Sequence, residues 1–190
     1  MSGSDHVYGR KVDKTGRSTG KFASSKTRKG HGPIGEQFLW LGRGMLDSPA
    51  MKVVSGPALK ILMRIGLEHL AHGGAGNGHL PVTYQNFRAE GVAKSTIALA
   101  LAELIALGFI ERTDAGRMGW GEDKGRPSTY RLTWLGTAER SKPTNEWQRH
   151  KSVEDAEKAV VEARAAVQGK RKAKRDAVAP PQPAPKALAG

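Results

Sequence analysis

Between residues 55 and 135 the apolar side chains follow first a helical and then an alternating period, and glycines separate the segments. An apolar residue at every third or fourth position is typical of an amphipathic helix, whereas strict alternation is typical of a half-buried strand. The pattern predicts a helix, a short strand, a helix, a tight turn, a helix, a strand, a glycine-rich loop and a strand. This order predicts a mainly α fold with a small β-hairpin.

Each of the three predicted helices begins after a residue whose hydroxyl group can accept a hydrogen bond from the first turn. Each ends at a glycine, which readily adopts the left-handed conformation that closes a helix. The predicted caps and stops, in chain order, are Ser55 with Gly73, Thr83 with Gly91, and Ser95 with Gly108.

Three short segments read as strands, and a further apolar cluster precedes the first helix. Leu80 and Val82 alternate as a very short strand, residues 109–113 are strand-like, and residues 129–134 alternate between polar and apolar. Residues 114–126 form the glycine-rich loop between the last two strands. The cluster that starts at Phe38 and ends before the turn Asp47-Ser48-Pro49 marks the beginning of the folded part.

Basic residues are concentrated at the two ends of the chain. Residues 1–35 carry 8 basic and 2 acidic side chains, residues 36–140 carry 12 and 10, and residues 141–190 carry 11 and 6. A balanced centre between basic ends fits a polyanionic partner. We predict a disordered basic arm at 1–35, a folded domain with an N-terminal helical extension at 36–140, a charged helix and basic run at 141–176, and a disordered Pro/Ala-rich tail at 177–190.

Several classes of protein are not expected from this sequence. There is no cysteine and no apolar run of membrane-spanning length, so we expect no thiolate metal site, no membrane association and a cytoplasmic, nucleoid-associated protein. We also expect no metal at His69 and His72, no cofactor and no enzymatic activity, because neither a Walker sequence nor a catalytic triad stands out. Three glutamates are expected to be solvated helix-surface residues: Glu68, Glu90 and Glu103.

Five short motifs between residues 80 and 133 follow one another in the order of a known fold: residues 82–87, 91–93, 95–97, 103–110 and 128–133. In this order and spacing the segment resembles small bacterial winged helix-turn-helix proteins of the winged-helix DNA-binding superfamily. The resemblance implies that the third helix enters the major groove of double-stranded DNA while the loop at 116–126 acts as the wing. The DNA-binding residues that it implies are Thr83, Tyr84, Lys94, Ser95, Thr96, Leu99, Arg117, Lys124, Arg126 and Arg131.

The third predicted helix has few side chains that can read bases. Its face opposite the core contains Ser95, Leu99, Ala102 and Ala106, where such helices commonly carry Arg, Gln or Asn. One explanation is recognition by charge and groove shape, with small apolar groups against thymine methyls. The other is that Leu99 and the alanines form a contact with a protein partner.

The basic ends and the wing allow further contacts with the phosphate backbone. In the wing, Arg117 is expected to contact phosphate or a minor groove, while Trp120 is expected to fold back on the domain. The tails are expected to bind DNA nonspecifically by counterion release through Lys26, Arg28, Lys29, Lys170, Arg171 and Lys172.

Three functions remain open at this level. The first is a transcriptional regulator, which binds as a homodimer if the helix at 153–168 or the one before Ser55 provides a contact. The second is a replication initiator or accessory factor of a plasmid, phage or transfer element. The third is an interaction module that recruits a protein through the face of Leu99 and Ala102.

Overall fold

The computed structural model describes residues 6–7, 10–11, 37–117, 119 and 125–178, and the chain divides into the units Met1–Phe38 and Leu39–Gly190. In the first unit, β1 (His6–Val7) pairs with β2 (Arg10–Lys11) in an antiparallel arrangement. These four residues lie within the arm that we expected to be disordered. The rest of that arm lies outside the described residues.

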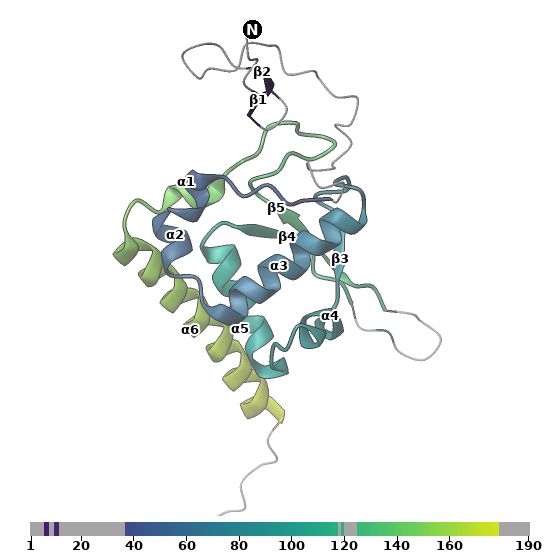
Figure 1. Ribbon diagram of the computed structural model, residues 1–190. Helices are drawn as coiled ribbons and strands as arrows, with labels where there is room; N and C mark the ends of the chain where they lie inside the picture. The colour runs from purple at the N-terminus through teal and green to yellow at the C-terminus, as the bar shows by residue number, and fades with distance from the viewer. Residues whose placement is uncertain (1–5, 8–9, 12–36, 118, 120–124, 179–190) are drawn as a thin grey trace, which may run out of the picture. The chain divides into compact units, whose positions relative to one another are not determined.

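The second unit combines helices with one small sheet (Figure 1). Its strands β3 (Leu80–Val82), β4 (Ile110–Asp114) and β5 (Ser128–Leu132) are antiparallel, in the order β3-β5-β4. The prediction of a mainly α fold with a small β-hairpin is confirmed at this level, and β3 adds a third strand to the hairpin. The helices are α1 (Arg43–Leu46), α2 (Pro49–Lys52), α3 (Gly56–Ala71), α4 (Tyr84–Ala89), α5 (Lys94–Ala106), a 3₁₀ turn (Glu146–Arg149) and α6 (Val153–Val178).

Two of the three predicted N-caps are confirmed. The Ser55 hydroxyl accepts a hydrogen bond from the backbone of α3, and Thr83 and Asn86 form a reciprocal capping box at the start of α4. The prediction that Ser95 caps the third helix is wrong. Helix α5 begins two residues earlier, after Ala93, because the chain leaves the Gly91 turn with Val92 already buried in the core.

Gly108 ends α5 as predicted, and its environment excludes any side chain. Its φ is +75°, and the Phe109 N–H donates to the Leu104 carbonyl at 3.0 Å, which closes the helix in a Schellman motif. A Cβ atom on Gly108 would lie 2.6 Å from the backbone carbon of Glu146. The position therefore needs glycine for both its conformation and its close approach to the next segment.

We expect Gly108→Ala to lower the free energy of unfolding by about 3 kcal/mol, since left-handed strain and overpacking each cost roughly 1 to 3 kcal/mol. Gly73→Ala is the matched control, because Gly73 has a similar φ of +67° and open space around its Cβ position. The control should lose only about 1 kcal/mol. Urea denaturation of both variants measures the difference, and equal losses would show that the contact with Glu146 does not matter.

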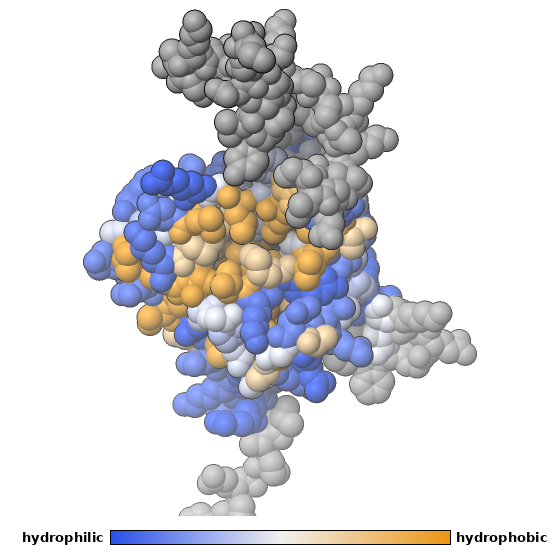
Figure 2. Space-filling model, in the orientation of Figure 1, coloured by the Kyte–Doolittle hydropathy of each residue, from blue (hydrophilic) through white to orange (hydrophobic). Residues whose placement is uncertain are grey.

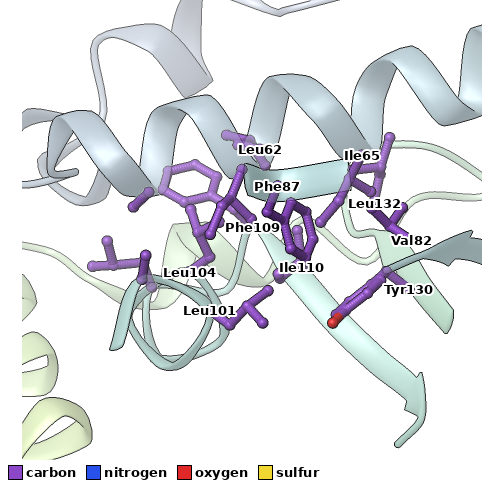
Figure 3. Packing of buried hydrophobic residues seen from close by; sticks show 14 of the residues in the cluster. Leu62, Ile65, Val82, Phe87, Leu101, Leu104, Phe109, Ile110, Tyr130 and Leu132 are labelled. Atoms are coloured by element: carbon purple, nitrogen blue, oxygen red, sulfur yellow. The ribbon is translucent and has the colours of Figure 1, made fainter. Parts of the chain in front are cut away.

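The core is built from the periodic apolar residues of all the central elements (Figure 3). Leu62 and Ile65 of α3 point into this core, where Ile65 lies beside Leu132 and Val82. The ring of Phe87 meets that of Tyr130 edge-on, with centroids 6.3 Å apart. These side chains are fully buried, so the packing of α3, α4 and α5 against the sheet fixes the positions of the connecting turns.

His69 is the buried histidine of α3, and only 7% of its surface is exposed. Burial lowers its pKa, and a hydrogen bond with the backbone at Ala75 opposes part of this shift. Because the lowered pKa belongs to the folded state, the unfolded chain binds the proton more readily, and stability falls as the pH drops through and below 6.5. We expect His69→Gln to make the stability less dependent on pH between 7.5 and 5, as measured by urea denaturation at several pH values.

In the described part of the chain, every helix is too short or too polar to cross a lipid bilayer.

Candidate nucleic-acid interface

Helix α6 lies along the outer side of α5, with the two helices antiparallel (Figure 1). Just before α6, the His150 side chain contacts the Ala106 carbonyl at the end of α5, at 3.0 Å. Further along, Arg164 pairs with Glu103, and Val167 lines a groove together with Ala102. The segment expected as a separate charged helix therefore packs against the folded domain, and it continues through the basic run to Val178.

This packing explains the small side chains on the outer face of α5. Leu99, Ala102 and Ala106 are half-buried, and the apolar stripe of α6 that faces them includes the buried Ala156 and Val160. The apolar stripe of α6 is narrow, whereas α5 is apolar on most of its sides. The α6 stripe covers part of α5 that the core leaves open. The face that we expected to meet DNA or a protein partner is occupied by another part of the same chain.

A buried carboxylate fixes α6 to the domain. Glu103 is fully buried and accepts hydrogen bonds from the Ser55 N–H at 2.6 Å and from the Ser55 hydroxyl at 3.0 Å. Arg164 of α6 donates to Oε2 of the same carboxylate, the oxygen that also accepts from the Ser55 hydroxyl. The expectation that Glu103 is solvated is wrong, because its side of α5 meets both the start of α3 and α6. Glu68 is also largely covered, whereas Glu90 remains exposed.

The exposed part of α5 is its first turn. Lys94 and Ser95 are exposed, and Thr96 is half-buried. Thr83 and Tyr84 at the start of α4 are exposed too, and 44% of the Tyr84 surface is accessible. Five of the residues predicted to bind DNA therefore lie at the beginnings of α4 and α5.

Next to this exposed turn, a groove of about 350 Å³ runs between α5, α6 and the sheet. Its floor is apolar and includes Ala98 and Val167. Its cations come from two different elements, β4 and the basic end of α6, and no acidic residue of the described chain lines it. The polar side chains of the lining are Tyr84, Arg112, Lys170, Arg171 and Lys174.

The four cations of this groove form no ion pair with a carboxylate among the described residues. Lys170, Arg171 and Lys174 come from successive turns of the side of α6 that faces α5. Lys172 points to the opposite side of α6, where it is exposed beside Arg175. The groove thus concentrates positive charge that no group of the described chain neutralises.

Arg112 is a groove cation of the folded domain that was not among the residues predicted to bind DNA. The available signal was its position in β4, two residues after the buried Ile110, because side chains at i and i+2 of a strand share a face. It pairs in register with Tyr130, whose ring lies in the core. Arg112 therefore lies on the edge strand β4, on the face of the sheet that the helices cover.

The hairpin continues beyond β4 and β5, because the backbones of Arg117 and Arg126 exchange two hydrogen bonds of 2.8 Å. The Arg126 guanidinium pairs with Asp114 at 2.8 Å and remains largely exposed. Lys124 and Trp120 lie outside the described residues, as do the predicted tail contacts Lys26, Arg28 and Lys29.

Arg131 is placed differently from the other predicted DNA contacts. Its side chain is only 12% exposed, and it pairs with Glu111 and with Glu146 at 2.6 Å each. Two carboxylates therefore neutralise its charge within the protein. Arg131 links β4, β5 and the segment before α6, and it does not line the groove.

The comparisons with known proteins give no family for this chain: no protein-family model matches it, and neither the curated proteins nor the solved structures provide a significant match. In the described part of the chain, no three His, Cys, Asp or Glu side chains lie together as metal ligands. The groove and the exposed turn beside it are therefore the features from which a function can be inferred.

Proposed function

We propose that this chain is a DNA-binding protein with a winged helix-turn-helix fold. The element order α3-β3-α4-α5-β4-β5, the sheet order β3-β5-β4 and the tight turn at Gly91 between α4 and α5 all support that fold. The observation that carries the function is the groove of unpaired cations beside the exposed first turn of α5. Phosphate groups are the partner that this charge arrangement suits best.

In this proposal, the duplex approaches the beginning of α5 and not its whole length. The first turn carries Lys94 and Ser95, and free backbone N–H groups at a helix start favour phosphate. Lys170, Arg171 and Lys174 of α6 flank the same approach and contact the sugar-phosphate backbone. Helix α6 occupies the rest of the α5 outer face, so base reading by that face is replaced by recognition of charge and groove shape.

The role that we propose to test first is transcriptional regulation. Footprinting across a genome distinguishes it from replication initiation, because a regulator protects promoter regions and an initiator protects an origin. The third function, recruitment of a protein through Leu99 and Ala102, is disfavoured by the packing of α6 on that face.

The experiment that tests DNA binding is a fluorescence-anisotropy titration of a labelled duplex of about 24 base pairs at several salt concentrations. The logarithm of the affinity should fall linearly with the logarithm of the salt concentration, with a slope of about −0.9 per phosphate contacted. Four groove cations and Lys94 together predict a slope of about −4 to −5. Affinity that does not change with salt would contradict the proposal.

Two arginines on neighbouring strands give a matched pair of variants. Arg112 forms no ion pair with a carboxylate of the described chain, so we expect it to contact one DNA phosphate. Arg112→Ala should therefore reduce the slope of log affinity against log salt by about 0.9 in magnitude. Arg131→Ala should leave the slope unchanged and lower the stability, because its charge is already paired with Glu111 and Glu146. The same titration and urea denaturation check both, and the opposite pattern would place the DNA on the other side of the sheet.

A further inference from the structure

The groove beside α5 has cations on both of its walls. Helix α6 forms one wall, with Lys170, Arg171 and Lys174. Strand β4 and the start of α4 form the other wall, with Arg112 and Tyr84, and α5 contacts all three elements (Figure 1). Figure 2 shows the hydrophilic surface at the basic end of α6. Positive charges on two facing walls favour an anion that lies between them.

The floor of the groove is apolar. Along α5 it consists of Leu101, which is buried, and of Ala98, Ala102 and Ile105, which are half-buried, and Val167 of α6 adds to it. The open space of about 350 Å³ above this floor lies within the range of roughly 300 to 1,000 Å³ that is usual for sites of small organic molecules. Such sites combine an apolar lining with a few polar groups that orient the ligand.

Duplex DNA alone does not account for this floor. The bases of a duplex are stacked in its interior, and a backbone contact brings only phosphates and sugars to the protein. The cations would then bind phosphate, while the apolar side chains below them would cover no apolar group. A ligand that fits both features has an apolar part and several negative charges, because four cations and no acidic residue of the described chain line the groove.

We propose that the groove binds a small organic phosphate of the nucleoside triphosphate type, with its ring on the α5 floor and its phosphate chain between the two walls. Arginine binds phosphate through two parallel N–H groups, and Arg112 and Arg171 provide one guanidinium on each wall. Tyr84 is 44% exposed and offers an aromatic ring on which a base can stack.

The composition of the floor also indicates how selective this site is. None of its described side chains, which are alanine, leucine, isoleucine and valine, can form a hydrogen bond with the edge of a base. Stacking on an apolar surface does not distinguish one base from another. We therefore expect adenine and guanine nucleotides to bind with similar affinity.

A nucleotide in the groove would compete with DNA. Both ligands need the same four cations, so a bound nucleotide releases the DNA backbone from this part of the protein. The affinity for DNA should therefore fall as the nucleotide concentration rises. This competition rests on the proposed function, whereas the binding of the nucleotide itself does not.

The test is a fluorescence-anisotropy titration of the full chain with methylanthraniloyl-ATP in the absence of divalent metal ions. We expect saturable binding of one nucleotide per chain. Tripolyphosphate carries the charged part alone, and it should displace the probe only at concentrations at least about tenfold higher than unlabelled ATP requires, because the stacked base adds to the affinity. Adenosine carries the ring alone, and it should displace the probe less effectively than either.

Variants separate the walls from the floor, and circular dichroism confirms that each is folded. Arg112→Ala and Arg171→Ala should each weaken ATP binding at least about fivefold, because each removes a charge-assisted contact from a different wall. Ala98→Leu fills the floor, so it should remove most of the preference for ATP over tripolyphosphate. Ala166→Leu is the matched control, since Ala166 is exposed on α6 and does not line the groove, and it should leave this preference unchanged.

Displacement of a labelled duplex by ATP distinguishes this site from the proposed function. ATP binding with the expected response to the variants, in a chain that binds no DNA, would support the site and contradict only the proposed function. DNA binding without ATP binding, or equal affinities for ATP and tripolyphosphate, would overturn the site. So would several bound nucleotides per chain that neither arginine variant weakens, because the net charge of +13 would then be the cause.

Discussion

Replacing Lys170, Arg171 and Lys174 together by alanine is expected to weaken binding to duplex DNA by about 500-fold at 0.1 M salt. Each neutralised phosphate contributes roughly an eightfold gain in affinity at this salt concentration through the release of counterions. The three side chains lie on the same side of α6 and line the same groove. The magnitude of the salt slope should fall by about 2.7 at the same time.

A second triple variant removes the same number of positive charges from parts of the surface outside the groove. Lys142, Lys151 and Lys158 are all exposed, and none of them lines the groove. Their replacement by alanine should change the affinity by less than about threefold, since distant exposed charges are screened. If both triple variants weakened binding equally, the net charge of the protein would matter and the groove would not.

The contact between Arg164 and Glu103 gives the second large effect, on stability. Arg164→Ala leaves the carboxylate of Glu103 buried with only the Ser55 hydrogen bonds. Removing one partner of a fully buried ion pair costs about 3 to 5 kcal/mol, and because Arg164 is 41% exposed we expect about 2 to 3 kcal/mol. Urea denaturation of the full chain measures this loss.

Adding Glu103→Gln to Arg164→Ala distinguishes the destabilisation caused by the buried charge from that caused by the lost packing of the Arg164 side chain. The double variant carries no uncompensated carboxylate, so it should be more stable than the sum of the two single changes predicts. Arg164→Ala should also weaken DNA binding, because α6 would hold its groove cations less firmly against α5. A loss of stability below about 0.5 kcal/mol would show that the ion pair does not fix α6 to the domain.

The local patterns were sufficient to predict the central elements. The caps at Ser55 and Thr83 and the stops at Gly91 and Gly108 depend on neighbouring residues, and the structure has each of them. The apolar periods likewise predicted helices at these places, and Leu62 of α3 and Leu104 of α5 lie in the core. These features follow from short-range geometry, which the order of the residues determines directly.

The position of α6 was not predictable in the same way. Its stripe of Ala156, Val160 and Val167 is thin, and no rule of local periodicity says which surface covers it. Glu103 shows the same limit, because it resembles a solvated helix residue until Ser55 and Arg164 are known to reach it. Contacts between residues about 50 or 60 positions apart decide both features.

The packing of α6 also changes how the small residues of α5 are interpreted. From the sequence, we expected Leu99 and the neighbouring alanines to contact DNA or a protein partner, and not another helix of the same chain. The structure has the internal contact, so the surface that we propose for DNA shifts to the start of α5 and the basic end of α6. This shift is the central claim of the proposed function.

The most direct test places a DNA-cleaving iron chelate at single positions, since the chain has no cysteine and each introduced cysteine is labelled uniquely. Gln85→Cys lies in the exposed start of α4 beside Tyr84, while Val161→Cys and Leu67→Cys lie on the outer sides of α6 and α3. We expect cleavage of bound duplex DNA from the chelate at Gln85→Cys and none from the other two positions. Cleavage from Val161→Cys or Leu67→Cys without cleavage from Gln85→Cys would contradict this expectation.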